Sequence, residues 1–322
     1  MRPVDGRVVV VLAIGLVAVR LAAAFALRHT FLSSGFPGYD EAASNLVHGR
    51  GFVQGGEPFS QFPPLYPLLV AAAYEIGGRA WWSIATMQTF FDIGSLIVLF
   101  ALGRRLFGRT AAIVACAAFV LYAPLASQSA QLLPTSPFVL TLLSFLYLLV
   151  RLADRPRVPT ALLAGLVAGI GFELRAEIPV VVLLAPVSLV LLGLSMRAAL
   201  RFGALTVVAF VIALVPATIR NALTFRVFNP GPAEAGITLW EGNSPFAARF
   251  VAAGRSGDLL FELPGSPHPP VTAGPYERDH FWRDRSLHWI DKHPGAFLHG
   301  LRVKFVALWR SEERRVGKEC RL

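Results

Sequence analysis

The stretch FGALTVVAFVIALVPATI, residues 202–219, contains no charged side chain. About 20 apolar residues in a helix cross the ~30 Å hydrocarbon core of a bilayer, and this run comes close to that length. Arginines stand on both sides of it, with Arg197 and Arg201 before the run and Arg220 directly after it. The pattern predicts a transmembrane helix with a basic flank.

The rest of the chain is apolar to a similar degree. Of its 322 residues, 55% are hydrophobic and only 16% are charged, and the mean hydropathy is +0.57, which is too apolar for one soluble core. Six further apolar runs cover Val8–Leu27, Ser83–Leu102, Ala111–Ala126, Pro137–Val150, Ala161–Phe172 and Ile178–Leu194. We predict an all-α polytopic membrane helix bundle with about seven spans. The first run exceeds the length of a signal-peptide core, and LAAAFALRHT is a poor cleavage site, so we expect an uncleaved span.

The formal net charge of +10 suggests a nucleic-acid partner at first sight. The arginines, however, lie in short loops between alternate spans: Arg104, Arg105 and Arg109; Arg151, Arg155 and Arg157; Arg197 and Arg201. Cytoplasmic loops carry such an excess of Arg and Lys. We therefore expect no nucleic-acid partner but a multi-pass protein of the plasma (inner) membrane, with the other loops extracytoplasmic.

Two of the outward segments are long, residues 28–82 and 220–293. The apolar piece FPPLYPLLVAAAYEIGG (62–78) is too short to span comfortably, and counting it as a span would turn the arginine loops outward. We expect a helix at the membrane interface. Long irregular segments are usually functional, which directs attention to these two loops.

The first outward loop holds the adjacent acidic residues Asp40 and Glu41, in a chain where acids are scarce. After the break at Pro37-Gly38, Asp40 can cap a helix and Glu41 suits the positive end of its dipole. A carboxylate just outside the first span is also within reach of the head group of a lipid-linked substrate, where it can act as a general base. Both interpretations stay open.

Several motifs occur in an order that resembles a known group of membrane enzymes. YDEAASNLVHGRGF, FPPLYPLL and a span ending LGRRLFGRTAA are followed by GFELRAEIPV, VPATIRNALTF, GITLWEGNSP and WIDKHPGAFL. This order resembles the polyprenyl-phosphate-sugar-dependent GT-C glycosyltransferases around the protein O-mannosyltransferases and aminoarabinose transferases, glycosyltransferase family thirty-nine and its bacterial relatives. The resemblance extends to Trp309, so we expect one GT-C domain over residues 1–309.

The resemblance implies an inverting sugar transfer on the outer face of the membrane. The donor is a polyprenyl-phosphate sugar, and the acceptor is a hydroxyl of a lipid, glycan or protein. By position, Asp40 orients or deprotonates the acceptor and Glu41 assists. No cofactor is required, and a divalent cation has no support in the sequence.

Cations stabilise a departing phosphate. Arg175 and Arg220 match family positions at the outer ends of spans, and snorkelling to lipid phosphates is the alternative for each. His48 and Arg50 are further candidates to line the site. His48 is as readily a polar surface residue, and we assign no metal ligand.

Three more residues are candidates, and two of them, Trp240 and Asp92, have a second interpretation. Trp240 and Asn243 of the second outward loop can stack on or hydrogen-bond a sugar, while Trp240 also suits an interfacial anchor. Asp92 inside the second predicted span is functional or else bonds a neighbouring helix alongside Gln88 or Thr89; we favour the helix contact.

The sequence departs from the family pattern in two places. Gln61 and Phe62 stand where some relatives have Glu-Lys, and Thr135-Ser136 where many have Thr-Glu. These changes concern donor contacts. A secondary transporter and a non-catalytic flippase partner remain as alternatives, and only the transferase requires a carboxylate at Asp40.

The last residues, RSEERRVGKECRL (310–322), resemble a translated sequencing adapter, with a basic cytoplasmic tail as the alternative. On the adapter interpretation the gene continues, and FLHGLRVKFVALW (297–309) begins an eighth span. The two cysteines, Cys116 and Cys320, support neither a disulfide framework nor a zinc site.

Overall fold

The computed structural model describes residues 3–31, 35–254 and 266–309; the predicted adapter segment, 310–322, lies outside the described residues. The chain forms two compact units. The first contains residues 1–59, 63–224 and 228–231. The second contains 60–62, 225–227 and the chain from 232 onward.

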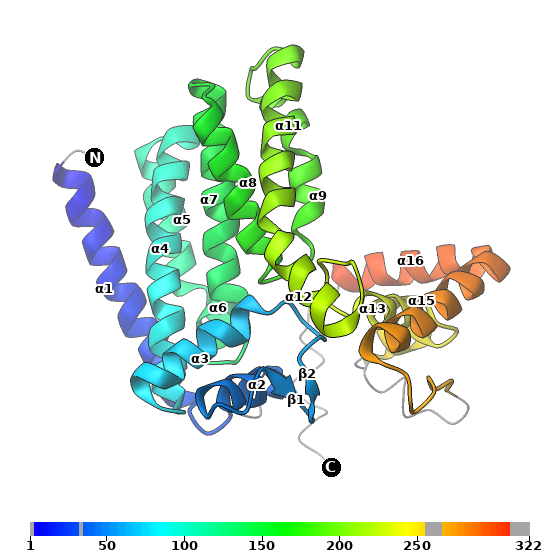
Figure 1. The fold of residues 1–322 in the computed structure, drawn as a ribbon. Coiled ribbons are helices and arrows are strands. Elements are labelled where there is room, and N and C mark those ends of the chain that lie inside the picture. Colours follow the sequence, from blue (N-terminus) through cyan, green and yellow to red (C-terminus); the bar gives the residue numbers. More distant parts are fainter. Residues whose placement is uncertain (1–2, 32–34, 255–265, 310–322) are drawn as a thin grey trace. The chain divides into compact units, whose positions relative to one another are not determined.

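The first unit is a bundle of helices with one small hairpin (Figure 1). Its elements are α1 (Pro3–Ala26), α2 (Pro37–Val47), β1 (Val53–Gln54), β2 (Glu57–Pro58), α3 (Leu65–Gly77), α4 (Trp81–Phe107), α5 (Arg109–Leu121), α6 (Ala123–Gln128), α7 (Thr135–Asp154), α8 (Val158–Phe172), α9 (Ile178–Leu183), α10 (Ala185–Leu191), α11 (Met196–Ala213) and α12 (Val215–Phe225). Neighbours pack in the order α1, α4, α7, α8 and α11, and the prediction of an all-α polytopic membrane protein is confirmed.

Four helices of the described residues are long and apolar enough to cross a bilayer: Asp5–Ala26, Trp81–Phe107, Thr135–Asp154 and Met196–Phe225. The other predicted spans form shorter helices, because α5 ends before α6 at Tyr122 and α9 ends before α10 at Leu184. A proline follows each break by two residues, Pro124 and Pro186. Proline offers no N–H to the preceding turn and disfavours helical geometry in the residue before it. Of the roughly seven predicted spans, the four long helices meet the length criterion, and the others are shorter or divided in the structure.

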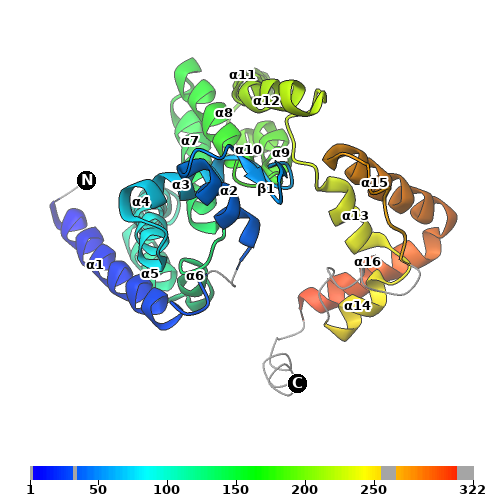
Figure 2. The same ribbon diagram turned by 60° about the horizontal axis from the view of Figure 1, so that its bottom comes forward.

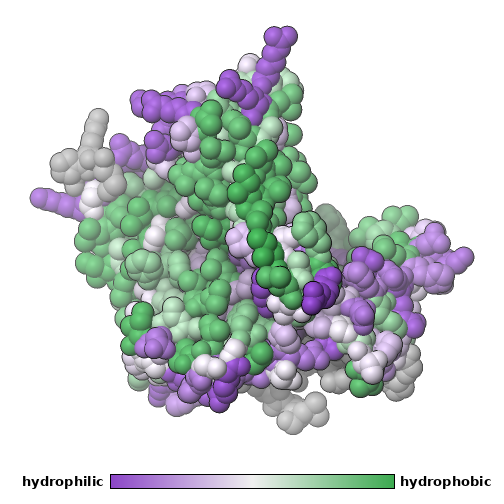
Figure 3. Space-filling view, in the orientation of Figure 1, coloured by the Kyte–Doolittle hydropathy of each residue, from purple (hydrophilic) through white to green (hydrophobic). Residues whose placement is uncertain are grey.

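The sides of the first unit suit contact with lipid. Figure 3 shows hydrophobic side chains covering the sides of the long helices and hydrophilic ones gathered at the helix ends. Large apolar side chains such as Ile14, Phe90 and Val114 are more than half exposed there. Exposed apolar side chains of this kind suit contact with the hydrocarbon of a bilayer. The helical form of the segments satisfies the backbone polar groups there.

The ends of the bundle differ in charge as the sequence predicts. The junctions α4/α5, α7/α8 and α10/α11, which hold the arginine loops, lie at one end, while α2, α3 and the hairpin lie at the other (Figure 1). At the arginine end Asp5 pairs with Arg104 and Arg109, and Asp154 pairs with Arg105. Helix α3 lies beside α2 at the opposite end instead of crossing with the spans.

Helices α8 and α11 pack closely because small residues face each other. A Cβ added to Gly165 would collide with the Thr206 carbonyl oxygen, and one on Gly169 would collide with Ala213. The Thr206 hydroxyl also donates to the Ala161 carbonyl at 3.3 Å. Small residues and a bridging hydroxyl are the usual means of joining helices in lipid. This contact fixes the end of α8 against the end of α11.

A buried ion pair joins α1 to α4. Arg20, fully buried, donates from Nε to Asp92 at 2.6 Å. Arg20 also donates to the carbonyls of Phe119 and Val120 at 3.3 Å each. The Val120 carbonyl has lost its helical donor because residue 124 is proline. The prediction that Asp92 bonds a neighbouring helix is confirmed, but its partner is Arg20, which the sequence analysis passed over.

We expect Asp92→Ala to destabilise the bundle by about 3–5 kcal/mol, because removing one partner leaves a buried charge uncompensated. The measurement is the thermal unfolding midpoint of the purified protein in detergent. The double variant Arg20→Met with Asp92→Leu leaves no charge unpaired and is expected to recover most of the loss. A wild-type midpoint for Asp92→Ala would contradict this account.

The second unit holds α13 (Ala235–Asn243), α14 (Ala247–Ala253), α15 (Pro275–Lys292) and α16 (Pro294–Leu308) (Figure 2). Helices α13 and α15 are joined where the Gly236 N–H donates to Asp279 at 2.6 Å, and a Cβ on Gly236 would collide with α15. Helix α16 covers the predicted start of an eighth span and packs on α14 and α15.

Candidate functional site

Helix α2 starts differently from the prediction. Phe36 is its N-cap and Pro37 its first residue, and no side-chain capping hydrogen bond is made at this end among the residues that the structure describes. The capping interpretation of Asp40 was therefore wrong. Tyr39 is buried against the Tyr66 ring of α3, with centroids 4.9 Å apart. This contact turns the neighbouring Asp40 toward the C-terminal end of α3.

Asp40 is held by two residues that follow far along the chain. The Arg79 guanidinium donates to both carboxylate oxygens, at 2.9 and 2.5 Å, and the Tyr74 hydroxyl donates to one of them at 2.6 Å. Asp40 is only 8% exposed. Burial, and secondly the bond to Asp40, raise the pKa of Tyr74 above its usual range, so this hydroxyl stays a donor. The carboxylate is thus fixed in one orientation.

The remaining candidates of α2 face the hairpin or solvent. Glu41 accepts from the Gly55 N–H at 2.7 Å, and Asn45 donates to the Val53 carbonyl at 3.0 Å. The His48 ring bonds the Ser44 carbonyl of its own helix at 2.7 Å, and Arg50 is exposed. Glu41 thereby fixes the hairpin turn.

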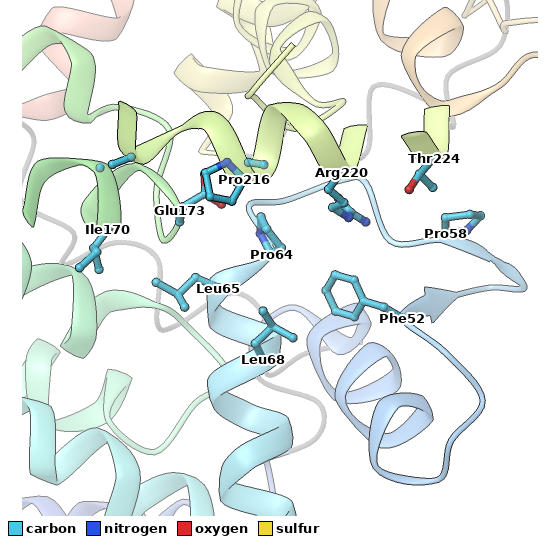
Figure 4. Close-up of a pocket in the computed structure, with 13 residues that line it drawn as sticks. Phe52, Pro58, Pro64, Leu65, Leu68, Ile170, Glu173, Pro216, Arg220 and Thr224 are labelled. Atoms are coloured by element: carbon cyan, nitrogen blue, oxygen red, sulfur yellow. The ribbon is translucent and has the colours of Figure 1, made fainter. Parts of the chain in front are cut away.

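A cavity of about 640 Å³ opens between the hairpin, α3, the end of α8 and α12 (Figure 4). Its wall is mostly apolar, and its residues are Phe52, Pro58, Pro64, Leu65, Leu68, Gly169, Ile170, Glu173, Ala213, Pro216, Ala217, Arg220 and Thr224. The residues from α11 and α12 repeat at helical spacing and form one face. Among the candidates from the sequence, Arg220 lines this cavity.

Arg220 is anchored at the cavity wall. Its guanidinium donates to the Phe59 carbonyl and, at 3.2 Å, to Asn221. It also lies over the Phe52 ring, 5.3 Å from the centroid, and points toward that ring in Figure 4. An arginine on an apolar wall is a suitable partner for a phosphate, since its planar fork of donors matches the oxygens.

Glu173, which the sequence analysis missed, lies in the same cavity. It follows the last residue of α8, and its carbonyl accepts from the Leu65 N–H at 3.2 Å. Its Oε1 atom is buried and has no hydrogen-bond partner among the residues that the structure describes. Burial raises the pKa of Glu173 to about 7, against the opposing charge of Arg220. An acid directly after the apolar run Ala161–Phe172 was the available signal.

Arg175 takes a different position from Arg220. It is exposed, it is not among the residues lining the cavity, and its guanidinium lies 5.7 Å from the centre of the Phe138 ring. The two arginines singled out from the sequence therefore have different surroundings.

The other two candidates belong to the second unit. Trp240 is 6% exposed and packs on Trp282 with ring centroids 5.6 Å apart. Its indole N–H has no partner within the described part of the chain. Asn243 accepts from Lys304 Nζ at 3.0 Å and donates to the Leu239 carbonyl at 3.0 Å. Trp240 also borders a separate cavity of about 510 Å³ along α15.

The described residues contain no cluster of three or more His, Cys, Asp or Glu side chains that could hold a metal ion. Cys116 is buried, and its thiol donates to the Leu96 carbonyl at 3.7 Å.

Comparison with known proteins gives one match. Residues 61–219 match the family model described as dolichyl-phosphate-mannose-protein mannosyltransferase. No curated protein matches significantly, and no solved structure does. The matched segment runs from before α3 into α12 and includes Tyr74, Arg79 and Glu173, while Asp40 lies before it and Arg220 directly after it. The resemblance drawn from the motifs is confirmed over residues 61–219: this segment of the multi-pass membrane chain is similar to the dolichyl-phosphate-mannose-protein mannosyltransferase family, which is of the GT-C type of glycosyltransferase.

Proposed function

We propose that this protein transfers a sugar, with inversion, from a polyprenyl-phosphate-sugar donor to an acceptor hydroxyl on the extracytoplasmic face of the plasma membrane. The observation that carries the proposal is the apolar cavity with Arg220 on its wall, in a chain of glycosyltransferase sequence. The acceptor is a lipid, a glycan or a protein of the cell envelope.

The cavity supports a lipid-linked donor. Its volume falls in the range of small-molecule sites, about 300–1,000 Å³, and side chains such as Leu68 and Ile170 offer apolar contact to isoprene units. Arg220 supplies donors and positive charge for the phosphate, which leaves as an anion. Stabilising that anion is the electrostatic part of catalysis.

The reaction needs a base for the acceptor hydroxyl, and Asp40 is proposed for that role. Its carboxylate accepts the proton as the hydroxyl oxygen bonds to the anomeric carbon, while the bond from that carbon to the phosphate oxygen breaks on the opposite face. Tyr74 and Arg79 hold the base in place. The displacement uses no cofactor.

The other candidates have supporting roles in this proposal. Glu41 assists Asp40 by fixing the hairpin that carries Phe52. His48, Arg50 and Arg175 are proposed contacts to the donor head group at the membrane surface. Trp240 and Asn243 remain proposals for sugar binding by the second unit.

The test is transfer of radiolabel from a panel of polyprenyl-phosphate sugars by membranes of cells expressing the gene, compared with membranes that lack it. Product that appears with one donor of the panel, with inverted anomeric configuration, supports the proposal. Absence of product from every donor, with the protein present in the membrane, would contradict it and favour the transporter or flippase-partner alternative.

The residues that hold Asp40 give a further prediction. Tyr74→Phe removes one hydrogen bond to a charged group, worth about 1.5–3 kcal/mol, so we expect kcat to fall about tenfold or more with KM nearly unchanged. Arg79→Met is expected to act in the same direction. The measurement is steady-state transfer with the best donor of the panel.

The matched control for this prediction is Tyr122→Phe, at the exposed break between α5 and α6. This variant is expected to match the wild type. A Tyr74→Phe enzyme with wild-type kcat would show that the hydroxyl does not position the base.

A further inference from the structure

The proposed donor cavity contains a carboxyl group, which as an anion would repel the phosphate of the donor. Glu173 and Arg220 line the same cavity, and Oε1 of Glu173 is buried without a hydrogen-bond partner among the described residues. A buried polar atom without a partner costs free energy. Such an atom in a native cavity is explained most simply by a ligand that completes its bonding.

We infer that Glu173 binds the donor phosphate as a neutral acid, donating its proton in a hydrogen bond to a phosphate oxygen that Arg220 also contacts. This inference rests on the proposed function, because it takes the cavity to be the donor site. It makes Glu173 a specificity residue for a singly charged phosphodiester and links donor binding to pH.

The electrostatic surroundings support a neutral carboxyl. The titratable groups on the elements around Glu173 are Glu57 of the hairpin; Tyr66, Tyr74 and Glu75 of α3; Arg175 and Glu177 of its own loop; and Arg220 of α12. Of these, Arg220 acts on Glu173 and favours ionisation, but burial outweighs it and holds the pKa at about 7. A phosphate that binds Arg220 offsets this single favourable charge, so the neutral form is favoured further.

The affinity for a phosphodiester depends on the protonation of Glu173. Below about pH 7 Glu173 is already protonated, and a phosphodiester meets a hydrogen-bond donor beside Arg220. Above pH 7 the free protein carries the carboxylate, which repels the phosphate, so binding has to take up one proton from solvent. Affinity is therefore highest at low pH and falls as pH rises, approaching a tenfold loss for each unit above the pKa.

The experiment measures binding, not transfer, so that the charge of the probe stays constant. A radiolabelled polyprenyl methyl phosphodiester keeps one negative charge between pH 5 and pH 9, whereas a phosphomonoester would titrate near pH 6. We expect wild-type affinity to fall about tenfold or more from pH 6 to pH 9. Glu173→Gln, a neutral hydrogen-bond donor of similar size, is expected to bind at pH 6 and to keep that affinity at pH 9.

The matched control is Glu177→Gln, which removes an exposed carboxylate four residues away and is expected to retain the wild-type fall. Wild-type affinity that does not change with pH, or a Glu173→Gln variant that keeps the wild-type fall or does not bind at pH 6, would overturn the inference. Proton-linked binding without sugar transfer from any donor would overturn the proposed function alone. Transfer together with pH-independent binding would overturn the inference alone.

Discussion

Replacing Asp40 by asparagine is expected to lower sugar transfer by about 10²–10⁴-fold, the contribution that a positioned general base usually makes. Asparagine has nearly the same size but cannot accept the proton of the acceptor hydroxyl. The Arg79 guanidinium, which donates to both carboxylate oxygens, also loses its anionic partner. The measurement is initial-rate transfer per mole of enzyme, at donor concentrations on either side of KM.

The control is a conservative change of another ion-paired aspartate. Asp154 pairs with Arg105 at the arginine end of the bundle, and Asp154→Asn is expected to transfer sugar at the wild-type rate. Transfer by Asp40→Asn at the wild-type rate would return Asp40 to a structural role as the partner of Arg79 and Tyr74.

Arg220→Gln is expected to reduce transfer by about 10²–10³-fold, the usual cost of removing one donor that stabilises developing charge in a closed site. Arg220 is the arginine of the sequence-derived candidates that lines the cavity. Glutamine keeps a hydrogen-bond donor for the Phe59 carbonyl but carries no charge. The loss should therefore concern the anionic leaving group more than the local fold, and it is measured as kcat/KM for the donor.

Two further variants make this result specific. Arg220→Lys retains the charge but not the planar fork, and we expect intermediate activity. Arg197→Gln changes an exposed arginine at the other end of the bundle and is expected to be neutral. Wild-type kcat/KM in Arg220→Gln would remove Arg220 from the donor site.

The sequence predicts the membrane bundle well because its signals are local. Apolar runs and arginine loops are read along the chain, and α3 is identified as too short to cross, all without knowledge of packing. Proline is a further local signal, because it predicts where a helix is interrupted. Pro124 and Pro186 divide two predicted spans, and the carbonyl that Pro124 leaves unbonded is bonded by Arg20.

The site is less predictable, because its pairs join residues far apart in the chain. Asp40 is recognisable as one of two adjacent acids in an outward loop, but Arg79 lies 39 residues later and reaches it only after α3 has packed on α2. Glu173 lies on the cavity wall at the end of α8, the helix that packs closely on α11. Burial there raises the pKa of its carboxyl group to about 7. No sequence spacing predicts the pairing of Asp40 with Arg79 or the position of Glu173 in the cavity.

The central claim is that the cavity beside Arg220 holds the lipid-linked donor, and photocrosslinking tests it most directly. A polyprenyl phosphodiester with a photoreactive group on the isoprene unit next to the phosphate is irradiated with the membrane-bound protein, and labelled peptides are mapped by mass spectrometry. We predict labelling of the cavity wall, at Phe52, Leu68 and residues 213–224, suppressed by excess unlabelled phosphodiester. Labelling spread over lipid-facing helices such as α1 and α5, unaffected by competitor and absent from the cavity wall, would contradict the account.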